Sequence, residues 1–229
     1  MEDLHILLKS DSEKPSREGI VRLLREAIYS GQLPPGMRLI ESELAEKMQV
    51  GRTPLREAIR QLEAEELIKV VPNKGATVVS YSRDDMREIY RICAVLEGMA
   101  ASLAVENLSL SELDKIKTMH TSMETRELQA EMRKWFLTNR ELHSVYLRCC
   151  QSPRLLKLIK QQISQLDRYW FILLSIPGMM EQSVSQHTEI IHAFEKRDSD
   201  LVRRLVEDHI LSVGFLLVAH LESIYPAVF

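Results

Sequence analysis

A tight break between two short helical patterns constrains the fold of this chain more than any other sequence feature. Residues 43–48 and 52–64 carry apolar residues at helical spacing, and Gln49-Val50-Gly51 separates them. Pro54 stands in the first turn of the second pattern, where a helix tolerates proline. The expected buried residues are Leu44, Ala45 and Met48 in the first pattern and Leu55, Ala58, Ile59 and Leu62 in the second. Two short helices across a tight turn are typical of a helix-turn-helix.

The flanking residues extend this prediction to a winged helix-turn-helix. A preceding helix is expected from Ser16, which suits an N-cap, to about Gly31. After the pair, residues 67–71 and 76–79 are rich in β-branched residues and surround the turn sequence Pro72-Asn73-Lys74-Gly75. We interpret the two segments as strands of a wing. A domain boundary near residue 80 follows, with a winged helix-turn-helix domain over 1–80 and a second domain over 81–229.

The second domain is predicted to be entirely helical. Apolar residues recur at helical spacing almost to its end, and Ser82, Ser109, Ser152 and Asp198 stand where N-caps are expected. Six helices are predicted, at about 84–107, 110–127, 129–150, 153–175, 181–197 and 199–222. The predicted fold class is therefore mainly α, with an N-terminal winged helix-turn-helix and a C-terminal all-α six-helix bundle.

Composition limits the classes of protein that fit. A net charge of −3 argues against a nonspecific nucleic-acid coat, so any DNA binding must come from a local basic patch. The apolar runs fall short of the ~18 residues that a membrane helix needs, and the N-terminus lacks an export signal. Cys93, Cys149 and Cys150 have no disulfide or metal spacing and are expected in the core. We expect a soluble cytoplasmic protein with no membrane partner.

A basic face on the helix predicted over residues 52–64 supplies such a patch. Arg52, Arg56 and Arg60 recur every four residues, and Thr53 lies beside the first. A recognition helix presents its first residues to base edges and phosphates, and arginine suits both. The alternative is a solvated helix face whose arginines pair with glutamates of the same helix.

The surrounding sequence resembles one family of regulators. The stretch LREAIYSGQLPPGMRLIESELAEKMQVGRTPLREAIRQLEAEELIKVVPNKGATV, residues 23–78, resembles the N-terminal domain of GntR-family regulators without a gap. The resemblance implies a homodimer on double-stranded palindromic operator DNA, and repression of transcription is expected. Gly51 departs from the usual Ser or Thr, and Ser42 from the Arg of some members. The candidate DNA-contacting residues are Arg38, Ser42, Arg52, Thr53, Arg56, Lys74 and Gly75.

Three histidines of the helical region occupy core-like positions in different predicted helices. They are His143, His187 and His209, and each is expected to point toward the bundle interior. Asn139 lies one turn before His143 on the same face. Converging imidazoles suit a divalent metal ion with open coordination positions. The alternative is that each histidine is separately hydrogen-bonded in the core.

Residues 84–222 resemble the FCD domain of FadR-type GntR regulators in its shorter, VanR-like form. The resemblance implies a metal site with the pattern D-x-x-x-H, then H, then H, which His143, His187 and His209 match. Asn139 replaces the usual Asp and leaves the site one charge more positive, so weaker metal binding or a stronger requirement for an anionic effector is expected. The expected cofactor is a divalent ion of the Zn, Ni or Mn class.

The same resemblance implies a small-molecule effector, an organic acid whose carboxylate binds the metal or an arginine. Cys93 stands where the family's R-x-x-x-E helix has its arginine, and Glu97 is retained. We group Cys93 with Arg91, Arg148 and Arg168 as candidate effector-binding residues. For Arg148 and Arg168, a surface salt bridge is the alternative.

A metal-dependent enzyme is the alternative function, because three histidines with an open position also describe catalytic zinc. The sequence offers no supporting general base: Glu141 is two residues from His143, on another face, and an H-E-x-x-H motif is absent. A helical interaction scaffold would leave the arginine face and the wing unexplained. The sequence therefore favours a DNA-binding regulator that is not an enzyme.

Overall fold

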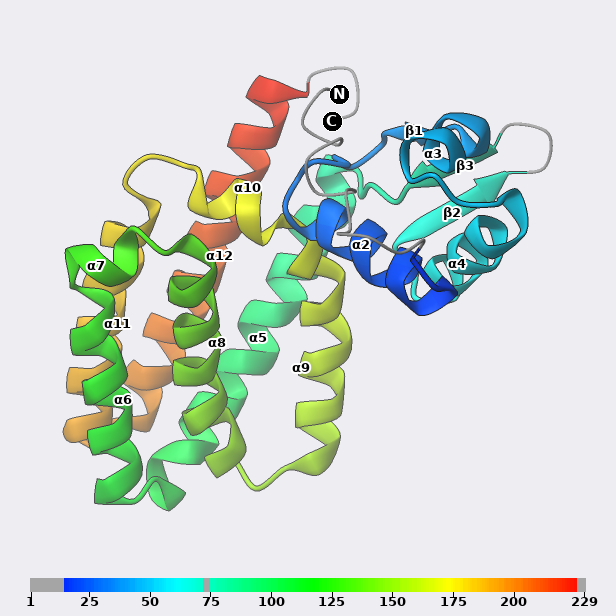
Figure 1. Cartoon of the computed structure of the whole chain (residues 1–229). Helices are drawn as coiled ribbons and strands as arrows, with labels where there is room; N and C mark the ends of the chain where they lie inside the picture. Colours follow the sequence, from blue (N-terminus) through cyan, green and yellow to red (C-terminus); the bar gives the residue numbers. More distant parts are fainter. Residues whose placement is uncertain (1–14, 72–74, 226–229) are drawn as a thin grey trace. The chain divides into compact units, whose positions relative to one another are not determined.

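A computed structural model describes residues 15–71 and 75–225 of the chain (Figure 1). The chain divides into two compact units between Tyr81 and Ser82. In these described ranges, no helix combines the length and the apolar character needed to cross a membrane.

The first unit is a small helical domain with an antiparallel sheet. Its elements are α2 (Arg17–Tyr29), β1 (Arg38–Leu39), α3 (Glu41–Lys47), α4 (Arg52–Ala64), β2 (Ile68–Val71) and β3 (Gly75–Val78). The Ser16 hydroxyl accepts a hydrogen bond from the Gly19 N–H and caps α2, as predicted. All of the residues predicted to be buried in α3 and α4 lie in one core with α2 and the strands. The predicted helix-turn-helix is confirmed.

The sheet contains one strand that the sequence did not reveal. The two wing strands, β2 and β3, pair antiparallel as predicted, and β1 pairs with the other edge of β3. With two residues, β1 is too short to show the alternation by which strands are recognised. The wing residues 72–74 lie outside the described residues.

The second unit is helical. Its elements are α5 (Arg83–Asn107), α6 (Leu110–Met123), α7 (Arg126–Gln129), α8 (Met132–Cys149), α9 (Pro153–Leu166), the 3₁₀ turn η1 (Asp167–Tyr169), α10 (Trp170–Leu174), α11 (Met179–Glu195) and α12 (Ser199–Ile224). Ser82 and Ser109 form capping boxes with Asp85 and Glu112. The three cysteines are buried free thiols, as expected.

Two predicted helices are divided in the structure. The helix predicted over 110–127 ends at Met123, because Thr125 accepts a hydrogen bond from the Leu128 N–H and starts α7. The helix predicted over 153–175 ends at Leu166 and continues through η1 into α10. The tighter 3₁₀ turn changes the helical phase. Both Arg168 and its neighbour Tyr169 are therefore buried.

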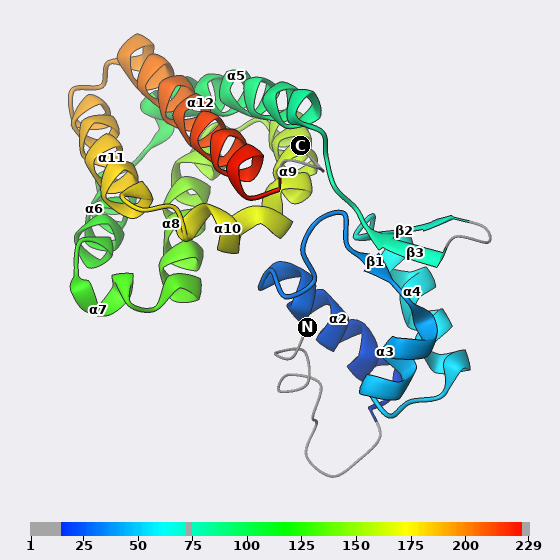
Figure 2. The same cartoon turned by 90° about the horizontal axis from the view of Figure 1, so that it is seen from above.

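The longest helices, α5 and α12, run side by side (Figure 2). They are antiparallel, since Gly98 faces Glu207 while Gly214 faces Tyr90. A Cβ atom added to Gly214 would lie 2.4 Å from Cγ of Tyr90. Glycine at this crossing therefore allows the two backbones to approach closely.

Candidate functional site

The start of α4 presents polar side chains to solvent. Arg52, Thr53 and Arg56 are all exposed, while the opposite face of the helix is buried. Gly51 is the N-cap and provides no side-chain hydrogen bond to the first-turn amides. Those amides and the helix dipole are therefore available to a phosphate group.

Arg56 does not pair with a glutamate of its own helix, α4. The Arg56 Nε donates to Oε2 of Glu41 at 2.6 Å, which joins α4 to α3. Glu63 instead accepts a hydrogen bond of 3.0 Å from the backbone N–H of Val70. With this pair formed, the Arg56 side chain remains 61% exposed.

The other predicted DNA-contacting residues lie on neighbouring elements of the first unit. Arg38 on β1 and Ser42 in the first turn of α3 are exposed. Gly75 begins β3 with φ of +87°, a conformation that residues with a side chain rarely adopt. Lys74 lies outside the described residues.

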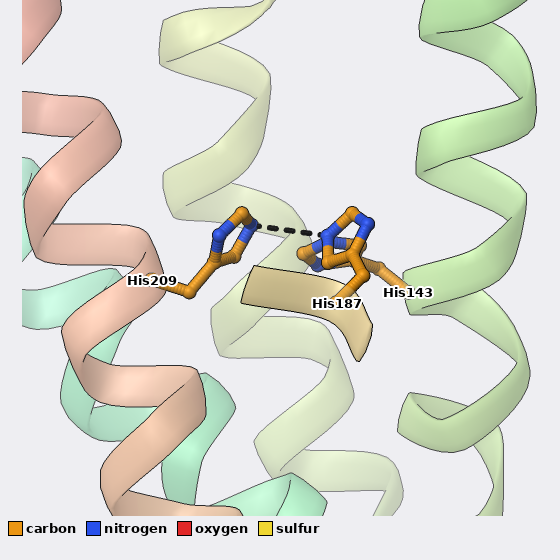
Figure 3. A group of neighbouring side chains, drawn as sticks. All are labelled: His143, His187 and His209. Atoms are coloured by element: carbon orange, nitrogen blue, oxygen red, sulfur yellow. Dashed lines mark hydrogen bonds between the residues drawn. The ribbon is translucent and has the colours of Figure 1, made fainter. Parts of the chain in front are cut away.

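In the helical unit, three histidines from three helices meet at one point (Figure 3). His143 comes from α8, His187 from α11 and His209 from α12. The Nε2 atoms of His143 and His187 are 3.1 Å apart, and those of His187 and His209 are 3.3 Å apart. One ring nitrogen of each residue lies within 4.8 Å of the others. The structure thus brings the predicted triplet together.

Hydrogen bonds behind two of the rings determine which nitrogen carries the proton. His143 Nδ1 lies 3.3 Å from Oε2 of Glu97 and 2.9 Å from the Tyr146 hydroxyl. His209 Nδ1 lies 2.8 Å from Oε1 of Gln186. Carboxylate and amide oxygens accept hydrogen bonds, so each Nδ1 is assigned as the donor. The Nε2 atoms of these two rings then direct their lone pairs at the centre.

Burial keeps the imidazole rings of His187 and His209 neutral. His187 and His209 are 1% and 2% exposed. Burial, followed by the nearby His209 and His143 rings, lowers the pKa of His187 well below its ordinary value. Burial, with His143 second, lowers the pKa of His209 to about 3. Neutral imidazole is the form that binds metal ions.

The donor set fits a divalent metal ion. The Nε2 lone pairs of His143 and His209 both point toward Nε2 of His187. Nε2 of His187 carries at most one N–H, and one N–H cannot make a good hydrogen bond to both lone pairs. Among the described residues, His187 Nδ1 and Asn139 Oδ1 are buried without a hydrogen-bond partner. A cation satisfies three inward nitrogen lone pairs together, and the Asn139 carbonyl offers a further oxygen.

A cavity of about 430 Å³ opens beside the histidines, a volume suited to a small molecule. His143, His209 and Asn139 form part of its wall. The exposed part of the wall comes from α8 and α9, with Arg140, Arg148 and Lys160 among its residues. The apolar wall includes Trp135, Phe136, Ile159, Ile163, Ile210 and Val213.

The four candidate effector-binding residues do not lie together. Arg148 lines the cavity and pairs with Glu141 at 2.9 Å, with both side chains 53% exposed. Arg91 is exposed on α5, and Cys93 is buried on the same helix; neither belongs to the described cavity wall. Burial, with Glu97 nearby, raises the pKa of the Cys93 thiol to about 12, so the thiol is neutral. Arg168 is 3% exposed, and the alternative of a surface salt bridge is wrong for it.

Sequence reasoning did not assign the residues behind the histidines. Glu97, Tyr146 and Gln186 contact the outer nitrogens of His143 and His209. The retained Glu of the R-x-x-x-E helix was a signal for Glu97. Tyr146 stands three residues after His143, on the same helix face, which was a weaker signal.

Comparison with known families identifies both units. The pattern described as "FCD domain" matches residues 88–212, more than half of the chain. The pattern described as "Bacterial regulatory proteins, gntR family" matches residues 16–78. The chain belongs to the GntR family. Its first unit is a GntR helix-turn-helix domain, and its second unit is a helical FCD domain.

Relatives of this GntR-family chain are named as transcriptional regulators. The HTH-type transcriptional repressor GlaR of Escherichia coli K12 is 30% identical over 200 residues, 83% of this chain and 90% of GlaR. The regulator McbR of the same organism is 26% identical over 188 residues, 81% of this chain and 85% of McbR.

Solved structures agree with the fold. A GntR-family transcriptional regulator from Pseudomonas syringae is 26% identical with a TM-score of 0.56, covering 99% of this chain and 97% of that one. The E. coli McbR/YncC structure has a TM-score of 0.65 at 24% identity, covering 88% and 96%, respectively.

Proposed function

We propose that this GntR-family protein is a DNA-binding transcriptional repressor whose operator affinity depends on an organic acid bound beside a metal ion in the FCD domain. The exposed Arg52, Thr53 and Arg56 at the uncapped start of α4 are the observation that carries DNA binding. Arginine makes bidentate contacts with guanine, and free helix amides bind phosphate. Arg38, Ser42, Lys74 and Gly75 are proposed as flanking contacts.

Substitution of Arg52 tests this assignment. Arg52→Ala is expected to weaken operator binding by about 1–3 kcal/mol, the usual contribution of a base-reading arginine. Arg126→Ala, which removes an equal charge from the exposed surface of α7, is the matched control. The operator is obtained by sequencing genomic fragments retained by the purified protein, and affinity is measured by fluorescence anisotropy. Equal affinities of the two variants would contradict the assignment.

For the metal, we propose that His143, His187 and His209 hold a divalent ion of the Zn, Ni or Mn class, with Asn139 beside them. When bound, the ion supplies a positive centre for an anionic group of the effector. His187→Ala is expected to abolish stoichiometric metal content, whereas His192→Ala, on the exposed side of α11, leaves it unchanged. Metal analysis of the purified proteins distinguishes these outcomes.

For the enzyme alternative, both carboxylates in the described cavity wall are already hydrogen-bonded, Asp167 to Arg140 and Glu97 to His143. Glu97, the carboxylate that contacts the triplet, lies at the outer Nδ1 of His143, away from the inward Nε2 atoms. Family membership and the named relatives favour regulation over catalysis.

We further propose that the protein is a homodimer that uses the outer face of α5 and α12. Val95 and Met99 on α5 are 61% and 52% exposed, and Phe215 on α12 is 73% exposed. Ile92, Leu103 and Leu211 add exposed apolar area to the same two helices. Exposed apolar side chains gathered on two helices that pack together suit an interaction site. The partner that covers this face is a second copy of the chain, because a palindromic operator requires two recognition helices.

A further inference from the structure

We infer that the effector is a monocarboxylate with an apolar alkyl or aryl body, and that dicarboxylates and tricarboxylates are poor effectors. The inference rests on the proposed function, because it names the class of acid that the same site takes. It follows from the wall of the cavity, from the pairing of the arginines in that wall, and from the position of the acidic groups.

The wall beyond the histidines is suited to an apolar body. Phe136 and Ile163 line the cavity from α8 and α9, and Ile210 and Val213 line it from α12, one and four residues after His209. Phe136 also stacks on Trp170, with ring centroids 5.2 Å apart, which fixes the aromatic part of the wall. An acid anchored at the histidine triplet therefore places its remaining atoms against hydrocarbon, and burial of that surface contributes to binding.

The arginines of the wall are already paired. Arg140 donates to Oδ1 of Asp167 at 2.9 Å, and its guanidinium lies 5.6 Å from the centre of the Phe136 ring. Arg148 pairs with Glu141 at 2.9 Å. A second carboxylate would have to share each arginine with the acidic partner that it already holds, or replace that partner. Both pairs are partly exposed, so the exchange brings little net attraction.

The acidic groups of the cavity oppose a second anionic group. Glu97 is 2% exposed and lines the cavity beside His143, and Asp167 lines it beside Arg140. Lys160 is an exposed residue of the wall, so solvent and salt screen its charge. A second carboxylate against the apolar part of the wall would be buried without a partner, and such burial is costly. The single anionic group of a monocarboxylate avoids this cost, because it is held by the metal.

Two acids of equal length test the inference directly. Hexanoate and adipate differ in one terminal carboxylate, and both are titrated calorimetrically into the zinc-loaded full-length protein. Hexanoate is expected to bind about tenfold or more tightly than adipate, since each tenfold corresponds to about 1.4 kcal/mol. Equal binding, tighter adipate binding, or no binding of hexanoate would overturn the inference.

A pair of variants on α9 tests whether the acid occupies this cavity. Ile163 is half-buried in the wall. Leu158, earlier on the same helix, is 49% exposed and lies outside the described wall. Ile163→Asp is expected to weaken hexanoate binding about tenfold through repulsion and lost apolar contact. Leu158→Asp, with the same change in charge, should leave binding unchanged. Equal effects of the two variants would count against the cavity.

Zinc content and operator affinity are measured on the same preparations. Intact zinc and DNA binding combined with a preference for adipate would overturn this inference and leave the proposed function standing. A parent protein that binds neither zinc nor DNA would contradict the proposed function itself, and this inference with it.

Discussion

Glu97 shows how a residue that need not touch the metal can set the properties of the site. Its carboxylate lies 3.3 Å from His143 Nδ1 and favours the tautomer whose Nε2 lone pair faces inward. Glu97→Gln is expected to lower metal affinity about tenfold, as is typical when the partner of a metal-binding histidine is lost. Competition with a fluorescent zinc chelator measures the change. Glu106→Gln, on the exposed surface of α5, is the control and should bind zinc like the parent.

At Asn139, the histidine site of this chain departs from the metal-binding pattern that it resembles. Its buried Oδ1 has no partner among the described residues, and as an amide it brings no charge to the site. Asn139→Asp is expected to tighten zinc binding and to weaken hexanoate binding, because the new carboxylate replaces the anion that the parent takes from the effector. Zinc competition and acid titration on one variant measure both effects. Weaker zinc binding would contradict this role.

At the scale of elements, the start of α5 has a defined contribution to stability. The Asp85 N–H donates to Ser82 Oγ, and the Ser82 N–H donates to the Asp85 carboxylate. Ser82→Ala is expected to cost about 1 kcal/mol of unfolding free energy, as for other N-caps. The control is Ser223→Ala, near the end of α12, and urea denaturation measures both variants.

The same capping box has a predictable pH dependence. The hydrogen bonds from the Ser82 side chain and backbone lower the pKa of Asp85 below its ordinary value of 3.8. Because the folded pKa is the lower one, the contribution is complete at neutral pH and is lost as the pH falls from about 4 through the folded value. The difference in stability between the parent and Ser82→Ala should therefore shrink below pH 4. A difference that grows on acidification would contradict this assignment.

Local sequence signals predicted the elements better than their junctions. The bounds of α4 follow from a clear apolar period and from Pro54, whereas apolar spacing continues through the breaks at Glu124 and Asp167 and conceals them. The histidine triplet could be predicted because each residue lies on a buried helix face. The place of Glu97 could not, because its contact with His143 joins positions 46 residues apart in the chain.

At the scale of the whole molecule, the account requires two copies of the chain. Phe215→Glu is expected to convert the proposed dimer to a monomer and to reduce affinity for the full palindrome more than for a half-site. A charge on the outer face of α12 opposes burial of that face. Sedimentation velocity measures the state of association. Leu137→Glu, at a 54% exposed position on α8, is the control. A Phe215→Glu protein that remains dimeric would place the interface elsewhere.

In the proposed function, the FCD domain controls DNA binding through an acid bound at its metal site. The most direct measurement is the operator affinity of the zinc-loaded full-length protein with and without saturating hexanoate, for the parent and for His187→Ala. The account predicts that hexanoate weakens operator binding several-fold in the parent, by a coupling of about 1–3 kcal/mol, and has no effect in the variant. An operator affinity that stays constant while hexanoate saturates the parent would contradict the claim.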